Sequence, residues 1–373
     1  MKRDRYTRRS RSKKNKNLHM PQELLIQILL RLPVKSLVRF KCVSKSWLSL
    51  IYDPHFARSH FELAPARTHR LVFLAASASE ARSIDSDVPL YNHSSAAAVK
   101  LDFLLPQSYP HAEIKGSCIG FLLLDCYTNL YVWNPSTGVH RRISCSPMEP
   151  NNFTFIHGFG YDPSTDDYLV VQASYDPGAD LTTHMEIFSL RTNTWKQIEG
   201  AHFPYMNSCD DARVGSLLNG AIHWLVWNYD LSVNVIVAFD LTERSCSEIP
   251  LPDDFFDDFE SCELWVLGGF LSLWAIGEGT TDIWVMEEYK VHSSWTKAIT
   301  VSTNDIPTQY FSPICSTKNG DIVGLDGTKG FVKYNDKGLL QEYCNDSHGC
   351  QVTMYTESLL SLPGHTEQPE EYD

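Results

Sequence analysis

A repeat with a period near fifty residues constrains the fold of this chain more than any other feature. Each copy has an apolar strand, a polar turn and a second strand that ends in or near an aliphatic or aromatic residue. The copies lie at 88–105, 130–143, 185–198, 235–249, 282–299 and 330–343. Equivalent positions at 91, 133, 188, 239, 285 and 333 are separated by steps of 42 to 55 residues. A unit of this length with about four strands is typical of a β-propeller blade.

Further strand signals precede most of these copies, for example at 119–124, 221–225 and 269–274. With 373 residues, 43% of them hydrophobic, the chain can bury a large core. We predict a kelch-like propeller over residues 67–363, with six blades, or seven if the pieces near 68–75 and 351–362 form a further closing blade. Tryptophans 224, 227, 265, 274 and 284 lie in strand-like runs and are predicted to be mostly core.

Residues 20–61 have a helical pattern instead. Leu25, Ile28, Leu29 and Leu32 recur at steps of three and four, which places them on one helix face. Pro33 ends that helix. A second stripe follows in Leu37, Phe40, Val43, Trp47 and Leu50, and a short third helix is expected at 55–61. So much apolar surface on a short module suggests a face meant for another protein.

This segment resembles the F-box of plant F-box proteins at 28–37, 43–47 and 53–56. Two departures are Met20, where the family usually has Leu, and Ser44, where many members have Cys. The resemblance implies a three-helix F-box at 19–62 that docks on the Skp adaptor of a cullin-RING ubiquitin ligase. The implied adaptor-binding residues are Pro21, Leu24, Leu25, Ile28, Leu29, Leu32, Pro33, Leu37, Val43 and Trp47. The alternative is that these residues are buried only against the rest of the chain.

The repeat region resembles the F-box-associated domain of the same proteins. The resemblance is carried by the segments 116–122, 133–138, 158–170, 220–225 and 238–241. It implies a fold that is mainly β with a small α module, and a substrate-recruiting role for the propeller. It implies no substrate identity.

Charge is divided unevenly along the chain. Residues 1–18 hold nine of the 32 basic side chains and one of the 45 acidic ones, so the remainder is strongly acidic. An acidic domain argues against a nucleic-acid partner, because phosphate binding requires clustered Lys and Arg. The basic tail is expected to be a disordered arm, a nuclear-import patch or a targeting peptide. Residues 364–373 form an acidic C-terminal tail.

Motifs for catalysis, cofactors or metals are weak. Ten scattered cysteines without a CxxC pair or a secretory leader predict a reducing compartment, cytoplasmic or nuclear. No apolar run is long enough for a membrane span. Asp162–Asp167 is better explained as a turn than as a cation loop, and Cys344–Cys350 as a turn rather than a metal site. We expect no metal, no cofactor and no catalytic residue.

One acidic, aromatic loop stands out at 253–260. Its residues Asp253, Asp254, Phe255, Phe256 and Asp257 are candidates for contact with a basic target, although a solvated connection between blades is the simpler interpretation.

The predicted function is substrate recognition for an SCF-type ubiquitin ligase without chemistry of its own. The Skp adaptor would bring cullin and RING subunits, and the propeller would hold an unidentified target protein. Two alternatives stay open: a propeller scaffold that acts without ubiquitin, and a sugar-binding or enzymatic propeller, since that fold also hosts catalysis. The last requires convergent polar groups at the channel mouth.

Overall fold

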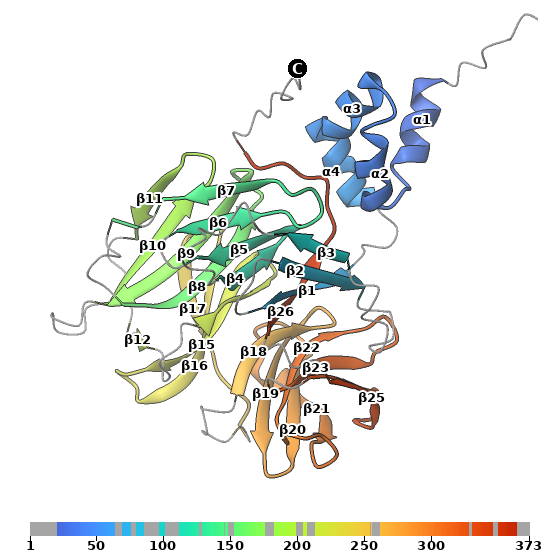
Figure 1. Ribbon diagram of the computed structural model, residues 1–373. Helices are drawn as coiled ribbons and strands as arrows, with labels where there is room; N and C mark the ends of the chain where they lie inside the picture. The colour runs from blue at the N-terminus through green and yellow to red at the C-terminus, as the bar shows by residue number, and fades with distance from the viewer. Residues whose placement is uncertain are drawn as a thin grey trace, which may run out of the picture.

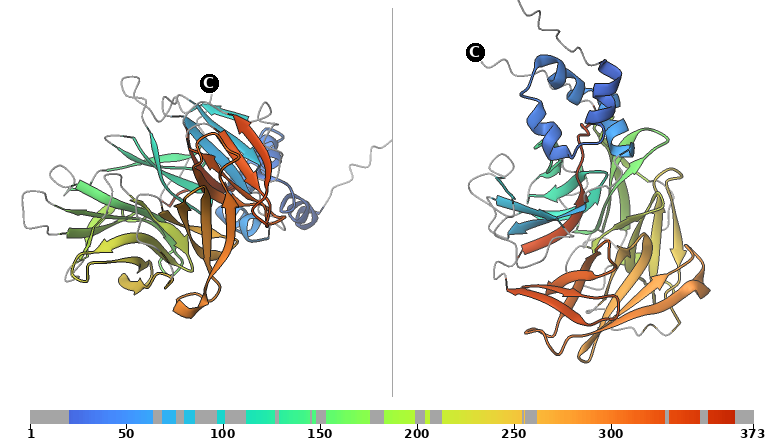
Figure 2. Two further views of the ribbon diagram at one scale, coloured as in Figure 1. Left: turned by 90° about the horizontal axis from the view of Figure 1, so that it is seen from below. Right: turned by 90° about the vertical axis from the view of Figure 1, so that its right-hand side faces the viewer.

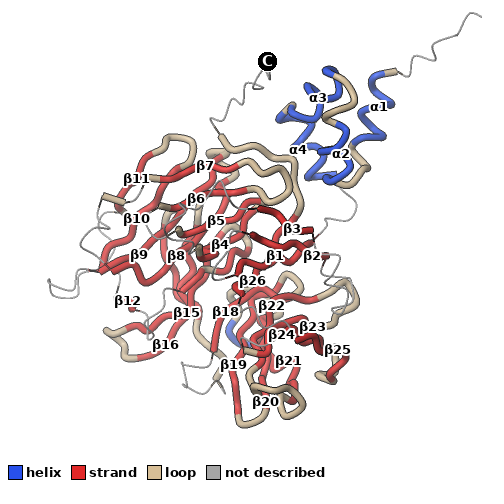
Figure 3. The backbone as a smooth tube through the Cα atoms, in the orientation of Figure 1, coloured by secondary structure: helices blue, strands red, loops and turns tan. Residues whose placement is uncertain are grey.

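The chain has an N-terminal helical module followed by a large β domain (Figure 1). The structure is a computed structural model that describes residues 21–63, 69–75, 80–85, 97–100, 112–126, 129–144, 146–147, 153–175, 183–198, 204–206, 213–253, 255, 262–327, 330–345 and 350–363. Figure 3 shows the α-helices gathered in one body; elsewhere in the described ranges the helical structure is the short 3-10 turn His292–Ser294. The predicted fold class is confirmed.

In the helical module, a proline directly precedes each of the first two helices. Its helices are α1 (Gln22–Leu29), α2 (Val34–Phe40), α3 (Lys45–Tyr52) and α4 (Pro54–Leu63). Pro21 and Pro33 stand directly before α1 and α2, where a fixed φ suits helix entry and a missing N–H breaks no intrahelical bond. Asp53 starts α4, because its Oδ1 accepts the backbone N–H groups of His55 at 2.8 Å and Phe56 at 3.0 Å.

The predicted second helix is two helices, so the described part of the module has four rather than three. The chain leaves the helical conformation at Ser44, which is extended with φ −162° and ψ 159°. The Ser44 Oγ accepts the backbone N–H of Trp47 at 3.2 Å and so caps a new helix. A tight turn at 41–43 preserves the three-residue spacing across the break, which is why periodicity alone continues the helix through it.

The β domain consists of six sheets within the described ranges, which confirms the six-blade alternative. The first sheet contains β26 (Cys350–Thr356), β1 (His69–Ala75), β2 (Glu80–Asp85) and β3 (Ala97–Lys100). The second contains β4 (Glu113–Cys118), β5 (Phe121–Asp125), β6 (Leu130–Trp133) and β7 (His140–Ile143). The third contains β8 (Phe153–Asp162), β9 (Asp167–Tyr175), β10 (Thr183–Ser189), β11 (Thr194–Gln197) and β13 (Arg213–Val214).

In each of the remaining three blades, neighbouring strands run antiparallel. The fourth contains β12 (Tyr205–Met206), β14 (Ser216–Leu218), β15 (Ala221–Asn228), β16 (Val233–Asp240) and β17 (Ser245–Ile249). The fifth contains β18 (Cys262–Leu267), β19 (Phe270–Gly277), β20 (Thr280–Met286) and β21 (Trp295–Ser302). The sixth contains β22 (Phe311–Ser316), β23 (Ile322–Asp326), β24 (Gly330–Tyr334) and β25 (Leu340–Asn345).

The two ends of the domain pair with each other and close the ring. Strand β1 runs antiparallel to β26, from His69 opposite Thr356 to Ala75 opposite Cys350. The segments near 68–75 and 351–362 therefore do combine, but within the sheet that holds β2 and β3, not as a seventh blade. The strands β26, β4, β8, β14, β18 and β22 contact one another in this order and surround the centre. The core fills the spaces between successive blades.

Candidate functional site

The helical module exposes part of its apolar surface. Leu24 and Ile28 on α1 are 56% and 46% exposed, and Val43 between α2 and α3 is 58% exposed. Pro21 and Pro33, at the starts of α1 and α2, are exposed as well. Within the described part of the chain, these five residues of the predicted adaptor-binding set are therefore accessible to another protein.

The other five predicted residues hold the module together to different degrees. Leu29 and Leu37 are fully buried in the core of the module, while Leu25, Leu32 and Trp47 are half-buried at its edge. Trp47 meets Phe40 edge to face, with ring centroids 5.4 Å apart. Leu29 and Leu37 thus support the surface from beneath and do not belong to it.

The spacing of apolar residues in the sequence did not predict two further exposed apolar residues of the module. Tyr52, at the end of α3, is 47% exposed, and Leu63, at the end of α4, is 60% exposed. The ammonium group of Lys41 lies 3.7 Å from the centre of the Tyr52 ring. Neither residue lies on the predicted stripes, so the sequence offered no signal for them beyond their apolar character.

The helical module also differs from the β domain in charge. Residues 21–63 hold six basic and three acidic side chains, although the chain as a whole has a formal charge of −13. The exposed cations Arg31, Lys35, Arg39 and Lys45 belong to the turn after α1, to α2 and to α3. Exposed apolar side chains on a module with an excess of cations favour a partner whose groove has an acidic rim.

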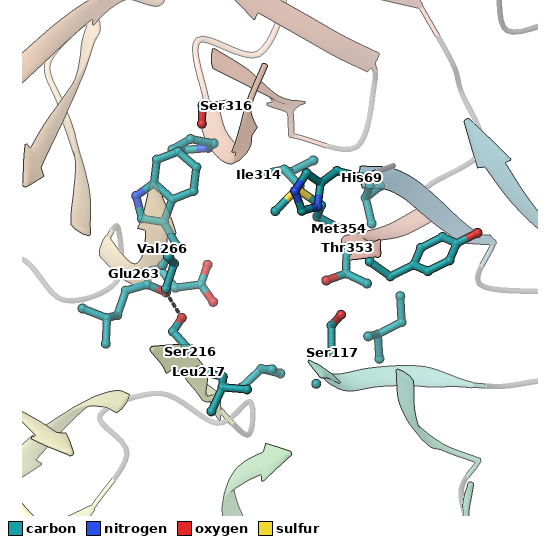
Figure 4. Close-up of a pocket in the computed structure, with 18 of the residues that line it drawn as sticks. His69, Ser117, Ser216, Leu217, Glu263, Val266, Ile314, Ser316, Thr353 and Met354 are labelled. Atoms are coloured by element: carbon teal, nitrogen blue, oxygen red, sulfur yellow. Dashed lines mark hydrogen bonds between the residues drawn. The ribbon is translucent and has the colours of Figure 1, made fainter. Parts of the chain in front are cut away.

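The propeller contains a central cavity of about 870 Å³. Its walls come from the innermost strands and are mainly apolar, with Val266, Ile314 and Met354 among them (Figure 4). Glu263 reaches toward the lumen from β18, and Ser117 and Thr353 lie on the opposite wall (Figure 4). Among the described lining residues, the polar side chains are one carboxylate, several hydroxyls and the side chains of His69, Lys318 and Gln351.

The acidic loop lies away from this cavity in its described part. Asp253 Oδ1 is 3.4 Å from His292 Nε2 of the neighbouring blade, and Phe255 packs against the apolar cluster between the fourth and fifth blades. Asp254, Phe256 and Asp257 lie outside the described residues. Asp253 is thus held at the flank between two blades, and its side chain remains 88% exposed.

The predicted turn at Asp162–Asp167 is confirmed. Residues 163–166 form the turn between β8 and β9, and Asp162 accepts hydrogen bonds from Ser164 and Thr165. Within the described ranges, no three His, Cys, Asp or Glu side chains are placed to hold a metal ion. Residues 346–349 of the predicted Cys344–Cys350 turn lie outside those ranges.

No helix in the described part of the chain combines the length and apolar character needed to cross a membrane.

Comparison with known proteins gives two domain matches and many relatives. Residues 17–59 match the F-box domain, and residues 72–357 match the F-box associated beta propeller domain. F-box/kelch-repeat protein At3g23880 of Arabidopsis thaliana is 30% identical over 358 residues, which cover 92% of this chain and 96% of the relative. F-box protein CPR1 of the same plant is 29% identical, over 76% of this chain and 73% of the relative.

Proposed function

The chain belongs to the F-box proteins with a C-terminal F-box associated β-propeller, and we propose that it is a non-catalytic substrate-recognition subunit of an SCF-type ubiquitin ligase. In this proposal the helical module binds a Skp adaptor, and through it the cullin and RING subunits. The propeller binds a target protein. The exposure of the apolar side chains Leu24, Ile28 and Val43, which the propeller leaves uncovered, is the observation that carries the proposal.

Binding of the adaptor follows from the surface of the module. Burial of the three apolar side chains would supply the driving force, at roughly 25 cal/mol for each Å² of apolar surface removed from water. The cations of the module would select a groove with an acidic rim and raise the association rate. Ubiquitin transfer is the work of other subunits, because recruitment acts only by raising the local concentration of target lysines.

The location of the protein is part of the same proposal. We infer a cytoplasmic or nuclear site of action, because an SCF-type ligase and ten cysteines without a disulfide pattern both fit a reducing compartment. The basic tail at 1–18 is proposed as a nuclear-import patch or a solvated arm.

Replacing Leu24 and Ile28 together with glutamate is expected to abolish capture of a Skp adaptor by the full-length protein. Both side chains are exposed on α1, so the change removes apolar contact area and adds charge without disturbing the core. The measurement is adaptor binding by biolayer interferometry, with circular dichroism to verify the fold. Leu231→Glu is the matched control, because Leu231 is 62% exposed on the turn between β15 and β16, remote from the module. Equal binding by the double variant and the control would refute the interface.

A further inference from the structure

The chain continues past its last propeller strand and returns to the helical module. Residues 357–363, here called the C-terminal strap, follow β26 without regular secondary structure. The strap runs between the propeller and the helices, close to α2 and α4 (Figures 1 and 2). Four of its side chains are apolar or small and fully or largely buried: Ser358, Leu359, Leu360 and Leu362.

Leu359 of the strap is part of the core of the helical module. It is 7% exposed and belongs to one apolar cluster with Leu29, Leu37, Ile51 and Phe56, and so with residues of α1 to α4. Leu360 packs against the same cluster from the edge. The four helices alone would therefore leave part of their apolar core open at this point.

The strap also contacts the propeller, through hydrogen bonds and through a buried leucine. The Nδ2 group of Asn134, a fully buried residue, donates to the carbonyl oxygens of Ser358 and Leu360, both at 3.2 Å, and to Ser358 Oγ at 3.1 Å. Arg141 Nη1 donates to the carbonyl oxygen of Pro363 at 2.9 Å. Leu362 is buried in the cluster between the second and third blades. Three carbonyl oxygens of the strap and the Ser358 hydroxyl thereby have hydrogen-bond donors inside the protein.

A further link joins α4 to the propeller directly. Arg58 Nη2 lies 2.5 Å from Asp166 Oδ1, in the turn between β8 and β9, and Arg191 Nη2 lies 2.7 Å from Asp166 Oδ2. The Tyr161 hydroxyl also donates to Asp166, and this bond is the main cause that lowers the pKa of that carboxyl group. Because Arg58, Asp166 and Arg191 are about half exposed, these ion pairs contribute little to stability.

We propose that the C-terminal strap is a functional part of the adaptor-binding module: Leu359 completes its core and positions helix α1, which carries Leu24 and Ile28, and the turn that carries Val43. Adaptor affinity then depends on residues near the C-terminal end of the chain, although the F-box lies near its N-terminal end. The strap also holds the module at a fixed orientation to the propeller, so a bound target and a bound adaptor are kept in one geometry. The positioning role rests on the proposed function, whereas the core role of Leu359 does not.

The test compares Leu359→Asp, Leu359→Ala and Leu359→Met in the full-length protein. Hydrogen exchange by mass spectrometry reports local opening, and biolayer interferometry reports adaptor binding. In Leu359→Asp we expect amides of α1 to α3 to exchange at least about tenfold faster and the adaptor dissociation constant to rise at least about tenfold, because a buried leucine is lost. Leu359→Ala is expected to show a smaller shift at the same sites, and Leu359→Met to stay within about twofold of the parent.

Leu339→Asp is the matched control, since Leu339 is 60% exposed in the turn between β24 and β25. It should leave the helices and adaptor binding unchanged. Parent-like helix exchange in Leu359→Asp would overturn the inference, and so would equal acceleration in the helices and in β15 and β16. If the parent protein does not bind the adaptor, the proposed function fails, while the exchange data still decide whether the strap completes the module.

Discussion

Replacing Trp224 with alanine is expected to lower the free energy of unfolding of the propeller by about 3–5 kcal/mol, the range for truncating a buried aromatic side chain. Trp224 is 1% exposed and packs in the cluster between the third and fourth blades. Its Nε1 donates to the carbonyl oxygen of His157 at 2.7 Å. That carbonyl also accepts the N–H of Gly215 at 2.8 Å, so the main cost of the substitution is the cavity and not an unpaired acceptor.

The space around Trp224 cannot easily collapse. A Cβ added at Gly158 would lie 2.6 Å from Trp224 Cζ2, and one added at Gly215 would lie 2.6 Å from its Nε1. The backbone at both glycines therefore packs directly against this ring. Urea unfolding followed by circular dichroism measures the loss. Trp227→Ala is the matched control, because Trp227 lies on the same strand and is half-buried; its loss should be clearly smaller. A loss below about 1 kcal/mol in Trp224→Ala would contradict the packing described here.

Periodicity predicted those parts of the fold that depend on neighbours in sequence. The stripe at Leu25, Ile28, Leu29 and Leu32 follows from the pitch of one helix, and the break at Pro33 from the chemistry of proline. The blades were predictable because each strand pair is local and each is repeated. The cap at Ser44 was missed because a single side-chain hydrogen bond decided it, while the spacing of apolar residues continued unchanged.

The other unpredicted features depend on contacts between distant parts of the chain. Nothing near Leu359 indicates that it enters a core formed by residues 29 to 57, because the pairing of β1 with β26 is what brings the strap there. Glu263 likewise reaches the lumen only because β18 is an innermost strand. The sequence also could not divide the ten predicted adaptor-binding residues into exposed and buried ones, since that division depends on how the four helices pack.

Two buried histidines make the stability of the propeller depend on pH. Burial lowers the pKa of His157 to about 3, and the nearby Lys115 acts in the same direction. Burial also lowers the pKa of His223 to about 4. Gln172 Nε2 donates to His157 Nδ1 at 3.1 Å, and the Tyr289 hydroxyl lies 2.8 Å from His223 Nε2. Both rings are therefore neutral in the folded protein at neutral pH.

Lowering the pH from 7 to 5 is expected to reduce the free energy of unfolding of the propeller by about 3–4 kcal/mol. In the unfolded chain both histidines have a pKa near 6.5 and bind protons in this range, while the folded protein does not. Stability is thus fully present above about pH 7 and is lost as the pH falls from 6.5 toward 4, at up to about 1.4 kcal/mol per pH unit for each histidine.

Urea unfolding at pH 8, 7, 6 and 5, at constant ionic strength, measures this slope. His157→Gln should reduce the slope by about half whatever it does to stability at pH 8, because it removes one of the two histidines that take up a proton in this range on unfolding. Leu231→Gln is the control and should keep the parent slope, because Leu231 is exposed and the change neither removes nor adds an ionisable group. Two outcomes would contradict the conclusion that both buried histidines are neutral in the folded protein. One is the same slope in His157→Gln and in the parent, and the other is a propeller that gains stability on acidification. Both require the folded protein to take up these protons at least as readily as the unfolded chain.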